Sequence, residues 1–171
     1  MERKDAVTMG GNPITLIGPE LKPGDKAPEF TLLDNSLNPV TLADSSGKVR
    51  LLSVVASLDT STCSTQTQGF NKEMAALGDK VASYTISADL PFAQGRFCGE
   101  HKIDNMKTLS DHRELSFGES YGLAIKDMRL LSRAVIVVDK DDTIRYMQTV
   151  SEVSQEPDYS KALDAIKEAL A

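Results

Sequence analysis

The two cysteines of this chain, Cys63 and Cys98, are its main candidates for chemistry. Cys63 lies between an apolar, β-branched run and an amphipathic segment, which predicts a sulfur near the N-terminus of a helix that follows a buried strand. Unpaired backbone N–H groups and the helix dipole would stabilise the reactive thiolate there. A buried, inert cysteine is the competing interpretation, because the nearby hydroxyls could equally be ordinary helix caps: Ser57, Thr60, Ser61, Thr62, Ser64 and Thr65.

Cys98 does not form a C-x-x-C motif with Cys63, so the usual signature of dithiol exchange is absent. A disulfide between the two would require their Cα atoms to come within about 7 Å. Without that, Cys98 would be a small apolar residue on a short helix. A zinc site with His101 and His112 is a further alternative, but the paired ligand spacings of structural zinc sites are missing.

Arg133 directly precedes an apolar run that is typical of a central strand. A guanidinium at that point could be aimed at a site by the strand end, where it would stabilise a thiolate and hold an oxygen atom. The alternative is a surface arginine at a strand boundary. Neither a G-x-G-x-x-G nor a G-x-x-x-x-G-K-[ST] motif occurs, so the sequence gives no support for a nucleotide cofactor.

The elements that must position these residues follow from hydrophobic pattern and turn chemistry. A charged or glycine-rich turn joins each of two predicted hairpins, and a proline-rich loop separates the first hairpin from the rest. The predicted strands are 7–9 paired with 14–17, 30–33, 49–55, 83–87, and 134–138 paired with 143–147.

Helices are predicted between and after these strands. Phe70, Met74 and Leu77 share one face of a helix that should end at Gly78. Asp89 and Pro91 are typical of a helix start, with an acidic cap and an early proline. The chain closes with a helix whose apolar face carries Tyr159, Leu163, Ile166 and Leu170.

Strands that alternate with helices, followed by a hairpin and a last helix, indicate an α/β fold with a mixed central sheet flanked by helices. This order is compatible with a thioredoxin-like fold, although the pattern alone does not single it out. With 171 residues, 40% of them hydrophobic, and no linker-like stretch, we expect one domain over residues 1–171.

Charge and hydropathy exclude some classes of function. The net charge is −6 and no Lys/Arg cluster occurs, which argues against nucleic-acid binding. No apolar run approaches the roughly 18 residues of a membrane span, and the charged start carries no apolar segment of a secretion signal. We therefore expect a cytoplasmic protein, in a compartment that keeps thiols reduced.

Several motifs, in order along nearly the whole chain, resemble the bacterial thiol peroxidases, which are atypical two-cysteine peroxiredoxins. The longest surrounds Cys63, and a second one includes Cys98. The segments that carry the resemblance are Ser53–Thr67 with Phe70-Asn71, Ser87–Gln94 continuing to Phe97-Cys98-Gly99, Leu130–Val135, Glu156–Tyr159, Pro23–Pro28 and the N-terminal Gly-Asn-Pro turn.

The resemblance implies a thioredoxin fold with an N-terminal β-hairpin extension (residues 1–19) and usually a homodimer. It also implies reduction of hydroperoxides with thioredoxin as reductant, and no metal, haem or flavin. By position, Cys63 matches the peroxidatic cysteine and Cys98 the resolving cysteine. Thr60 matches the threonine three residues before the nucleophile, and Arg133 the arginine that completes the site.

One departure from the family pattern P-x-x-x-T-x-x-C concerns Ala56, which stands where the proline belongs. That change could soften the loop and slow the peroxidase. It therefore keeps open a thioredoxin-fold redox sensor or disulfide oxidoreductase with weak peroxidase activity, and, more remotely, a module that only binds a partner. Gly69 is a second oddity, since glycine inside a helix costs about 1 kcal/mol relative to alanine.

Overall fold

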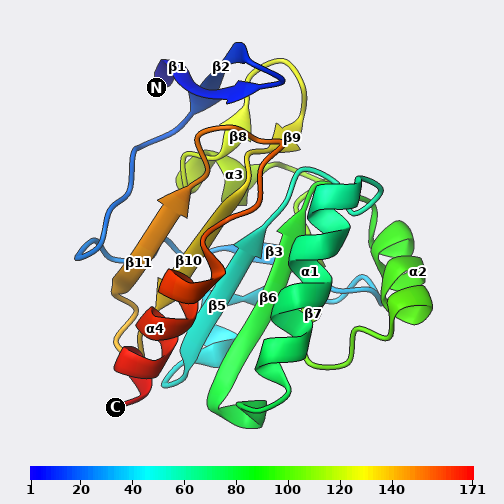
Figure 1. Ribbon diagram of the computed structural model, residues 1–171, viewed down its shortest axis with the longest axis vertical. Helices are drawn as coiled ribbons and strands as arrows, with labels where there is room; N and C mark the ends of the chain where they lie inside the picture. Colours follow the sequence, from blue (N-terminus) through cyan, green and yellow to red (C-terminus); the bar gives the residue numbers. More distant parts are fainter.

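A seven-stranded mixed sheet forms the centre of the molecule, in the order β11-β10-β5-β6-β7-β3-β4. The computed structural model describes all residues 1–171 (Figure 1). β5, β6 and β7 are parallel, and β10, β11, β3 and β4 run antiparallel to their neighbours. The strands are β3 (Thr31–Leu33), β4 (Pro39–Thr41), β5 (Val49–Val54), β6 (Val81–Ser87), β7 (Lys107–Ser110), β10 (Ala134–Val138) and β11 (Ile144–Thr149).

The central strands are apolar on both faces because helices cover both. Along β5, Leu51 faces one hydrophobic cluster and Leu52 the other, as the alternation of strand side chains requires. The first cluster receives the helices α1 (Ser61–Met74), α2 (Pro91–His101) and α4 (Tyr159–Leu170), and the second receives α3 (Ser116–Ser120). Figure 1 shows α1 and α4 side by side on the near face of the sheet.

The predicted N-terminal hairpin is present as β1 (Glu2–Met9) and β2 (Asn12–Ile17). Gly10 and Gly11 form its turn, both with positive φ, which glycine adopts at no steric cost. β2 continues into a second, four-stranded sheet with β8 (Ala124–Ile125) and β9 (Leu130–Leu131). β1 also pairs with the segment after β11. The Thr8 N–H donates to the Ser151 carbonyl, and the Val153 N–H donates to the Thr8 carbonyl, both at 2.8 Å.

The predicted α/β fold with a mixed sheet is confirmed, and two local predictions need correction. α1 begins at Ser61, which agrees with the predicted place of Cys63 near a helix N-terminus, but it ends at Met74 rather than at Gly78. After Met74 the helix tightens into a three-residue turn, with Leu77 N–H bonded to the Met74 carbonyl, so Gly78 opens a short 3₁₀ turn instead. Asp89 does not cap α2, whose N-cap is Leu90.

Gly69 lies inside α1 and faces the ring of Tyr159 in α4. A Cβ at this position would meet that ring at 3.6 Å, which is ordinary van der Waals contact. Close packing therefore does not require glycine here, and its cost to the helix is simply tolerated.

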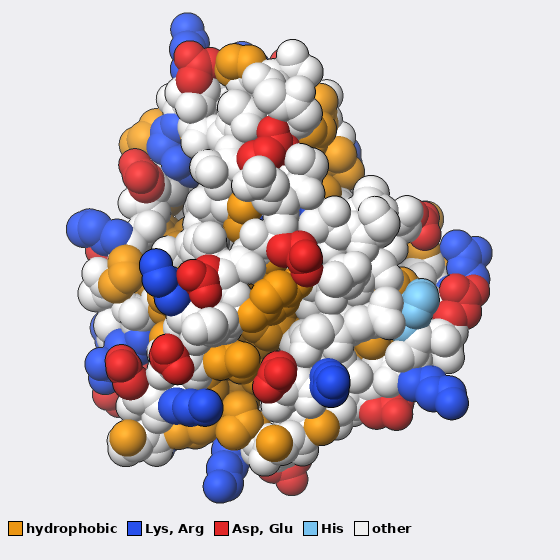
Figure 2. All heavy atoms as spheres, in the orientation of Figure 1, with side chains coloured by type: hydrophobic (Ala, Val, Ile, Leu, Met, Phe, Trp, Pro, Cys, Tyr) orange, Lys and Arg blue, Asp and Glu red, His pale blue; other side chains and the backbone are white.

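The outer surface shows no accumulation of one sign of charge on the face in Figure 2. Lys and Arg side chains are interspersed there with Asp and Glu. No helix of the structure combines the length and the apolar character that crossing a membrane would require.

Candidate active site

Cys63 is the third residue of α1, the helix that follows the carboxyl end of β5 after a six-residue loop, and its side chain is fully buried. Thr60, in extended conformation, is the N-cap residue. The backbone N–H groups of Ser61, Thr62 and Cys63 have no acceptor in the structure, because the first turn of a helix lacks preceding carbonyls. The sulfur therefore lies at the positive end of the helix, as the sequence predicted.

Arg133 lies beside this sulfur, at the start of β10. Its Nη2 donates to Cys63 Sγ at 3.3 Å, its Nη1 to the Gln66 side-chain oxygen at 2.9 Å, and its Nε to the Val153 carbonyl at 2.8 Å. It is only 2% exposed, and none of the ion pairs in the structure includes it. Its charge thus has no carboxylate partner, and the ionisable side chain to which it donates is the Cys63 thiol.

Gln66 is a site residue that the sequence did not reveal. It is fully buried one turn after Cys63 on the core side of α1, and its amide donates to Ser53 Oγ at 2.8 Å while its oxygen accepts from Arg133. A polar amide on the buried face of a helix was the available signal, since such groups are normally hydrogen-bonded to something specific.

The Val153 carbonyl that holds Arg133 belongs to the segment that pairs with β1. Val153 N–H donates to the Thr8 carbonyl at 2.8 Å, so the N-terminal hairpin fixes this segment. The neighbouring Glu152 carboxylate accepts from both glycine N–H groups of the hairpin turn, at 3.2 and 2.9 Å, and from Thr8 and Ser154. These bonds hold the pKa of Glu152 far below its ordinary value, with the Ser154 hydroxyl as the largest cause.

Thr60 is exposed and makes no hydrogen bond to Cys63. Its hydroxyl donates to the Ser57 carbonyl at 2.8 Å, so its lone pairs remain available to accept a hydrogen bond from a bound molecule. Thr60 also lines a groove of about 610 Å³ between the start of α1 and α2. The walls of the groove are Leu58–Ser61 and Ser64, from the segment that contains Cys63, and Ala93, Arg96, Phe97, Glu100 and His101, from α2.

Cys98 stands near the carboxyl end of α2 and is partly buried against the cluster that contains Cys63. Its Sγ lies 3.4 Å from Thr108 Oγ1. Thr108 in turn donates to Asn35 Oδ1 at 2.8 Å, so the Cys98 thiol is the donor in the sulfur contact. Both cysteines are free thiols, on different helices and with different partners.

The zinc alternative finds no support in the geometry. Nowhere do three or more His, Cys, Asp or Glu side chains come together as metal ligands would. His101 lies against the Phe97 ring at a centroid distance of 4.4 Å, and His112 follows β7 on another part of the molecule.

Ala56, the residue that departs from the family pattern, follows β5 and is buried in the same cluster as Cys63. Its backbone N–H has no acceptor in the structure. A proline, which lacks this N–H, would therefore remove no hydrogen bond here.

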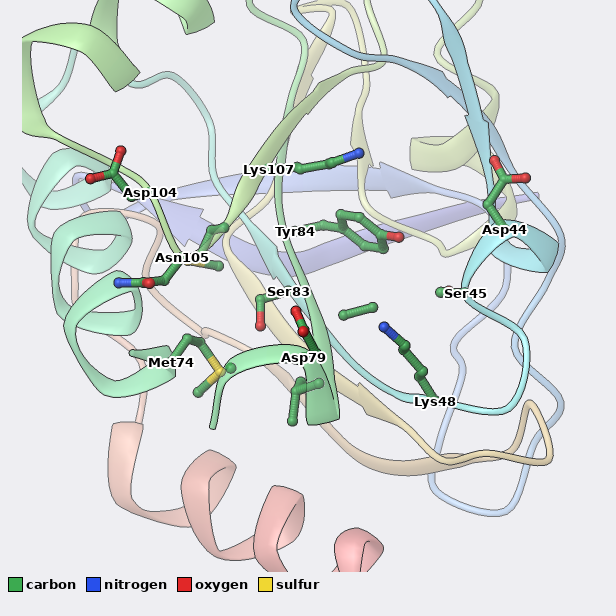
Figure 3. A pocket seen from close by; sticks show the side chains of 14 residues that line it. Asp44, Ser45, Lys48, Met74, Asp79, Ser83, Tyr84, Asp104, Asn105 and Lys107 are labelled. Atoms are coloured by element: carbon green, nitrogen blue, oxygen red, sulfur yellow. The ribbon is translucent and has the colours of Figure 1, made fainter. Parts of the chain in front are cut away.

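A second cavity, of about 360 Å³, lies at the opposite end of the parallel strands, where β6 and β7 begin. Its lining mixes acidic and basic side chains and contains neither cysteine nor histidine. Figure 3 shows Asp44 and Asp104 on opposite sides of this cavity, so its carboxylates do not converge on one point. We see no redox chemistry that it could perform.

Comparisons with known proteins give the family and the fold of the chain. The family model described as Redoxin matches residues 22–163. The thiol peroxidase of Halalkalibacterium halodurans is 56% identical over 165 residues, covering 96% of this chain and 99% of the relative. That of Bacillus subtilis is 53% identical over 161 residues, covering 94% and 96%. The crystal structure of a peroxiredoxin-like protein from Aquifex aeolicus superimposes with a TM-score of 0.91 at 39% identity, over 96% of this chain and 97% of that one.

The chain belongs to the Redoxin family, and its fold is thioredoxin-like. It is a peroxiredoxin-type oxidoreductase with the role of a thiol peroxidase.

Proposed function

We propose that Cys63 is the peroxidatic nucleophile of this enzyme. Its thiolate attacks the terminal oxygen of a hydroperoxide, an S–O bond forms, and the O–O bond breaks. The other oxygen leaves as an alkoxide or hydroxide and takes up a proton to give an alcohol or water. Cys63 loses two electrons, which the peroxide gains, and becomes a sulfenic acid.

The observation that carries this assignment is the contact between Arg133 Nη2 and Cys63 Sγ. A buried guanidinium without a carboxylate needs an anion, and the thiolate supplies it. Only three of the five N–H groups of Arg133 have partners, so the remaining two can bind the peroxide oxygens as negative charge develops. The free Cys63 N–H can bind the same oxygens.

Thr60 acts as an acceptor in this scheme. Since its own O–H donates to the Ser57 carbonyl, its oxygen can accept a hydrogen bond from the O–H group of the incoming hydroperoxide and orient the O–O bond. The groove that Thr60 lines is the entry route for the substrate.

Cys98 is the resolving residue. Its thiol condenses with the Cys63 sulfenic acid, forming an S–S bond and releasing water. A disulfide requires the sulfurs to come within about 2.05 Å, and both cysteines are free thiols in this structure. The segments that carry them must therefore move, and local unwinding of α2, of the start of α1, or of both would supply this movement. Thioredoxin then reduces the disulfide by thiol exchange in the cytoplasm, and the enzyme works as a homodimer.

The test is NADPH oxidation coupled through thioredoxin reductase and thioredoxin, with cumene hydroperoxide and hydrogen peroxide as substrates. Turnover should be rapid, absent in Cys63→Ser, and limited in Cys98→Ser to about one peroxide per chain. Normal cycling of Cys98→Ser would contradict its resolving role. Slow reaction with peroxide but fast exchange with a partner disulfide would instead indicate a redox sensor.

A further inference from the structure

The loop from β5 into α1 is held by Asp89, which lies between β6 and α2. The Asp89 carboxylate accepts from the Ser57 hydroxyl at 2.7 Å, the Leu58 N–H at 2.8 Å and the Ser87 hydroxyl at 2.7 Å. The Ser57 carbonyl in turn accepts the Thr60 hydroxyl proton. The position of Thr60 in the groove therefore depends, through Ser57, on Asp89.

The same carboxylate is connected to the helix that bears Cys98. Ser87, one of its donors, also accepts from the Gln94 side-chain amide at 3.0 Å. Gln94 is fully buried and lies one turn before Cys98 in α2. The Ser110 hydroxyl donates to the Asp89 backbone carbonyl and fixes the start of α2 against β7.

We propose that Asp89 is a positioning residue that acts on both cysteines. Its carboxylate and the three donors Ser57, Leu58 and Ser87, together termed the Asp89 latch, tie the loop before Cys63 to the start of the helix that carries Cys98. The two segments then open together rather than separately. This role rests on the proposed function. It adds a residue that speeds the reaction of Cys63 with peroxide and slows formation of the Cys63–Cys98 disulfide.

The latch has opposite effects on the two half-reactions. While it is closed, the loop, Thr60 and the first turn of α1 are in place, which favours attack of Cys63 on peroxide. Condensation of the Cys63 sulfenic acid with the Cys98 thiol, which releases water and needs no further reagent, requires the latch to open. A second peroxide can meanwhile oxidise the sulfenic acid to sulfinic acid, so a tighter latch also increases overoxidation.

Substitution by asparagine tests the latch with little change in side-chain volume. The amide offers one acceptor oxygen in place of two, and its NH₂ group would face a donor, either the Leu58 N–H or a serine hydroxyl. Asp89→Asn thus weakens the latch, and Ser57→Ala removes only one of its donors. If Asp89→Asn does not fold, Ser57→Ala keeps the proposal testable.

The decisive measurement separates the two half-reactions by quenched flow and mass spectrometry of Cys63 and Cys98, since the chain has no tryptophan for fluorescence. For Asp89→Asn we expect a roughly tenfold slower reaction with peroxide, as for loss of one hydrogen bond to a charged group. We also expect faster disulfide formation and less sulfinic acid at a given peroxide concentration. A slower first step with unchanged or increased overoxidation would overturn the proposal, as would unchanged rates.

Amide hydrogen exchange tests whether the two segments open together. Asp89→Asn should increase exchange both in the loop around Leu58 and in α2 around Gln94. Faster exchange in the loop alone would show that Asp89 holds only the loop, and the coupling would be wrong.

Asp139→Asn is a matched control. The Asp139 carboxylate likewise accepts from three donors, here the backbone N–H groups of Asp141 and Thr143 and the side chain of Arg145, but it lies in the β10–β11 turn at the other end of the sheet. It should leave the ratio of disulfide to sulfinic acid unchanged. If the wild-type enzyme itself forms no disulfide with peroxide, the proposed function fails; if it does and Asp89→Asn behaves like it, only the latch fails.

Discussion

Two arginines are buried at opposite ends of the central sheet, Arg50 near the start of β5 and Arg133 beside the end of that strand. Both are almost inaccessible to solvent, and both donate hydrogen bonds to neighbouring residues. The acceptors of Arg50 include a carboxylate, whereas the acceptors of Arg133 do not. The partners of Arg50 are Ser45 Oγ (2.8 Å), the Asp139 carbonyl (2.7 Å), the Leu42 carbonyl (3.2 Å) and Asp142 Oδ1 (2.6 Å).

The difference separates a structural arginine from a functional one. Burial of a cation is costly unless an anion compensates it, and Asp142 compensates Arg50 within the fold. Arg133 is compensated only when Cys63 is a thiolate or when an anion is bound. The fold therefore places an uncompensated positive charge at the position where the reaction generates negative charge.

The largest effect should follow from Arg133→Met. Methionine can fill much of the same space, so we expect an unchanged or higher melting temperature, because an uncompensated buried charge is removed. The reaction of Cys63 with peroxide should slow by roughly 10²–10³-fold, as for loss of an oxyanion donor. Quenched flow gives the rate and circular dichroism the melting temperature; a rate near that of the wild type would refute the functional role.

Arg50→Met should show the reverse pattern. It removes all four hydrogen bonds of Arg50, although the Leu42 and Asp139 carbonyls keep the Ser45 hydroxyl and the Asp142 N–H as donors, so the free energy of unfolding should fall by about 2 kcal/mol. Urea denaturation measures this change. The rate with peroxide per folded molecule should stay the same, and a large loss of rate would show that the two ends of the sheet are not independent.

The features that the sequence predicted depend on local pattern. Strands such as Ala134–Val138 stand out as apolar runs, and the place of Cys63 follows from a strand that precedes a helix. β7 was missed because Lys107–Ser110 is short and half polar, and α3 because it has five residues. Neither offers a clear period.

The residues that position the site were missed for another reason. Glu152, Asp89 and Thr108 have partners far away in the sequence, and one chain gives no sign of such pairings. An acidic residue before a proline is typical of a helix cap, so the sequence predicts that role for Asp89. The structure shows that its carboxylate is used on the Cys63 loop instead.

A smaller effect on Arg133 should come from Glu152→Gln. Loss of acceptor capacity loosens the hairpin from the segment whose Val153 carbonyl holds the guanidinium, so the reaction with peroxide should slow several-fold, roughly the effect of one weakened hydrogen bond. The ratio of disulfide to sulfinic acid should stay that of the wild type. Glu156→Gln, in the same segment but bonded only to Tyr159, is the control and should leave the rate unchanged.

The pH dependence of this variant has a definite sign. The pKa of Glu152 is lower in the folded state than its ordinary value of 4.5. Its stabilising contribution is therefore fully present above about pH 4.5 and is lost as the pH falls towards the lowered pKa. The difference in melting temperature between the wild type and Glu152→Gln should shrink in acid; a difference that grows there would contradict this contribution.

Ala56→Pro should have the smallest effect, and it tests how far the loop before Cys63 is already fixed by Asp89. The Ala56 N–H has no acceptor, so proline removes no hydrogen bond and reduces the freedom of the unfolded chain, a stabilisation of about 0.4–1 kcal/mol. If the loop is already fixed by Asp89, the rate with peroxide should rise by less than about twofold in the wild type, whose latch is intact, and more in Asp89→Asn. An equal gain in both backgrounds would mean that proline and the carboxylate act on the loop independently, and a lower rate in both would mean that the loop geometry here has adapted to alanine.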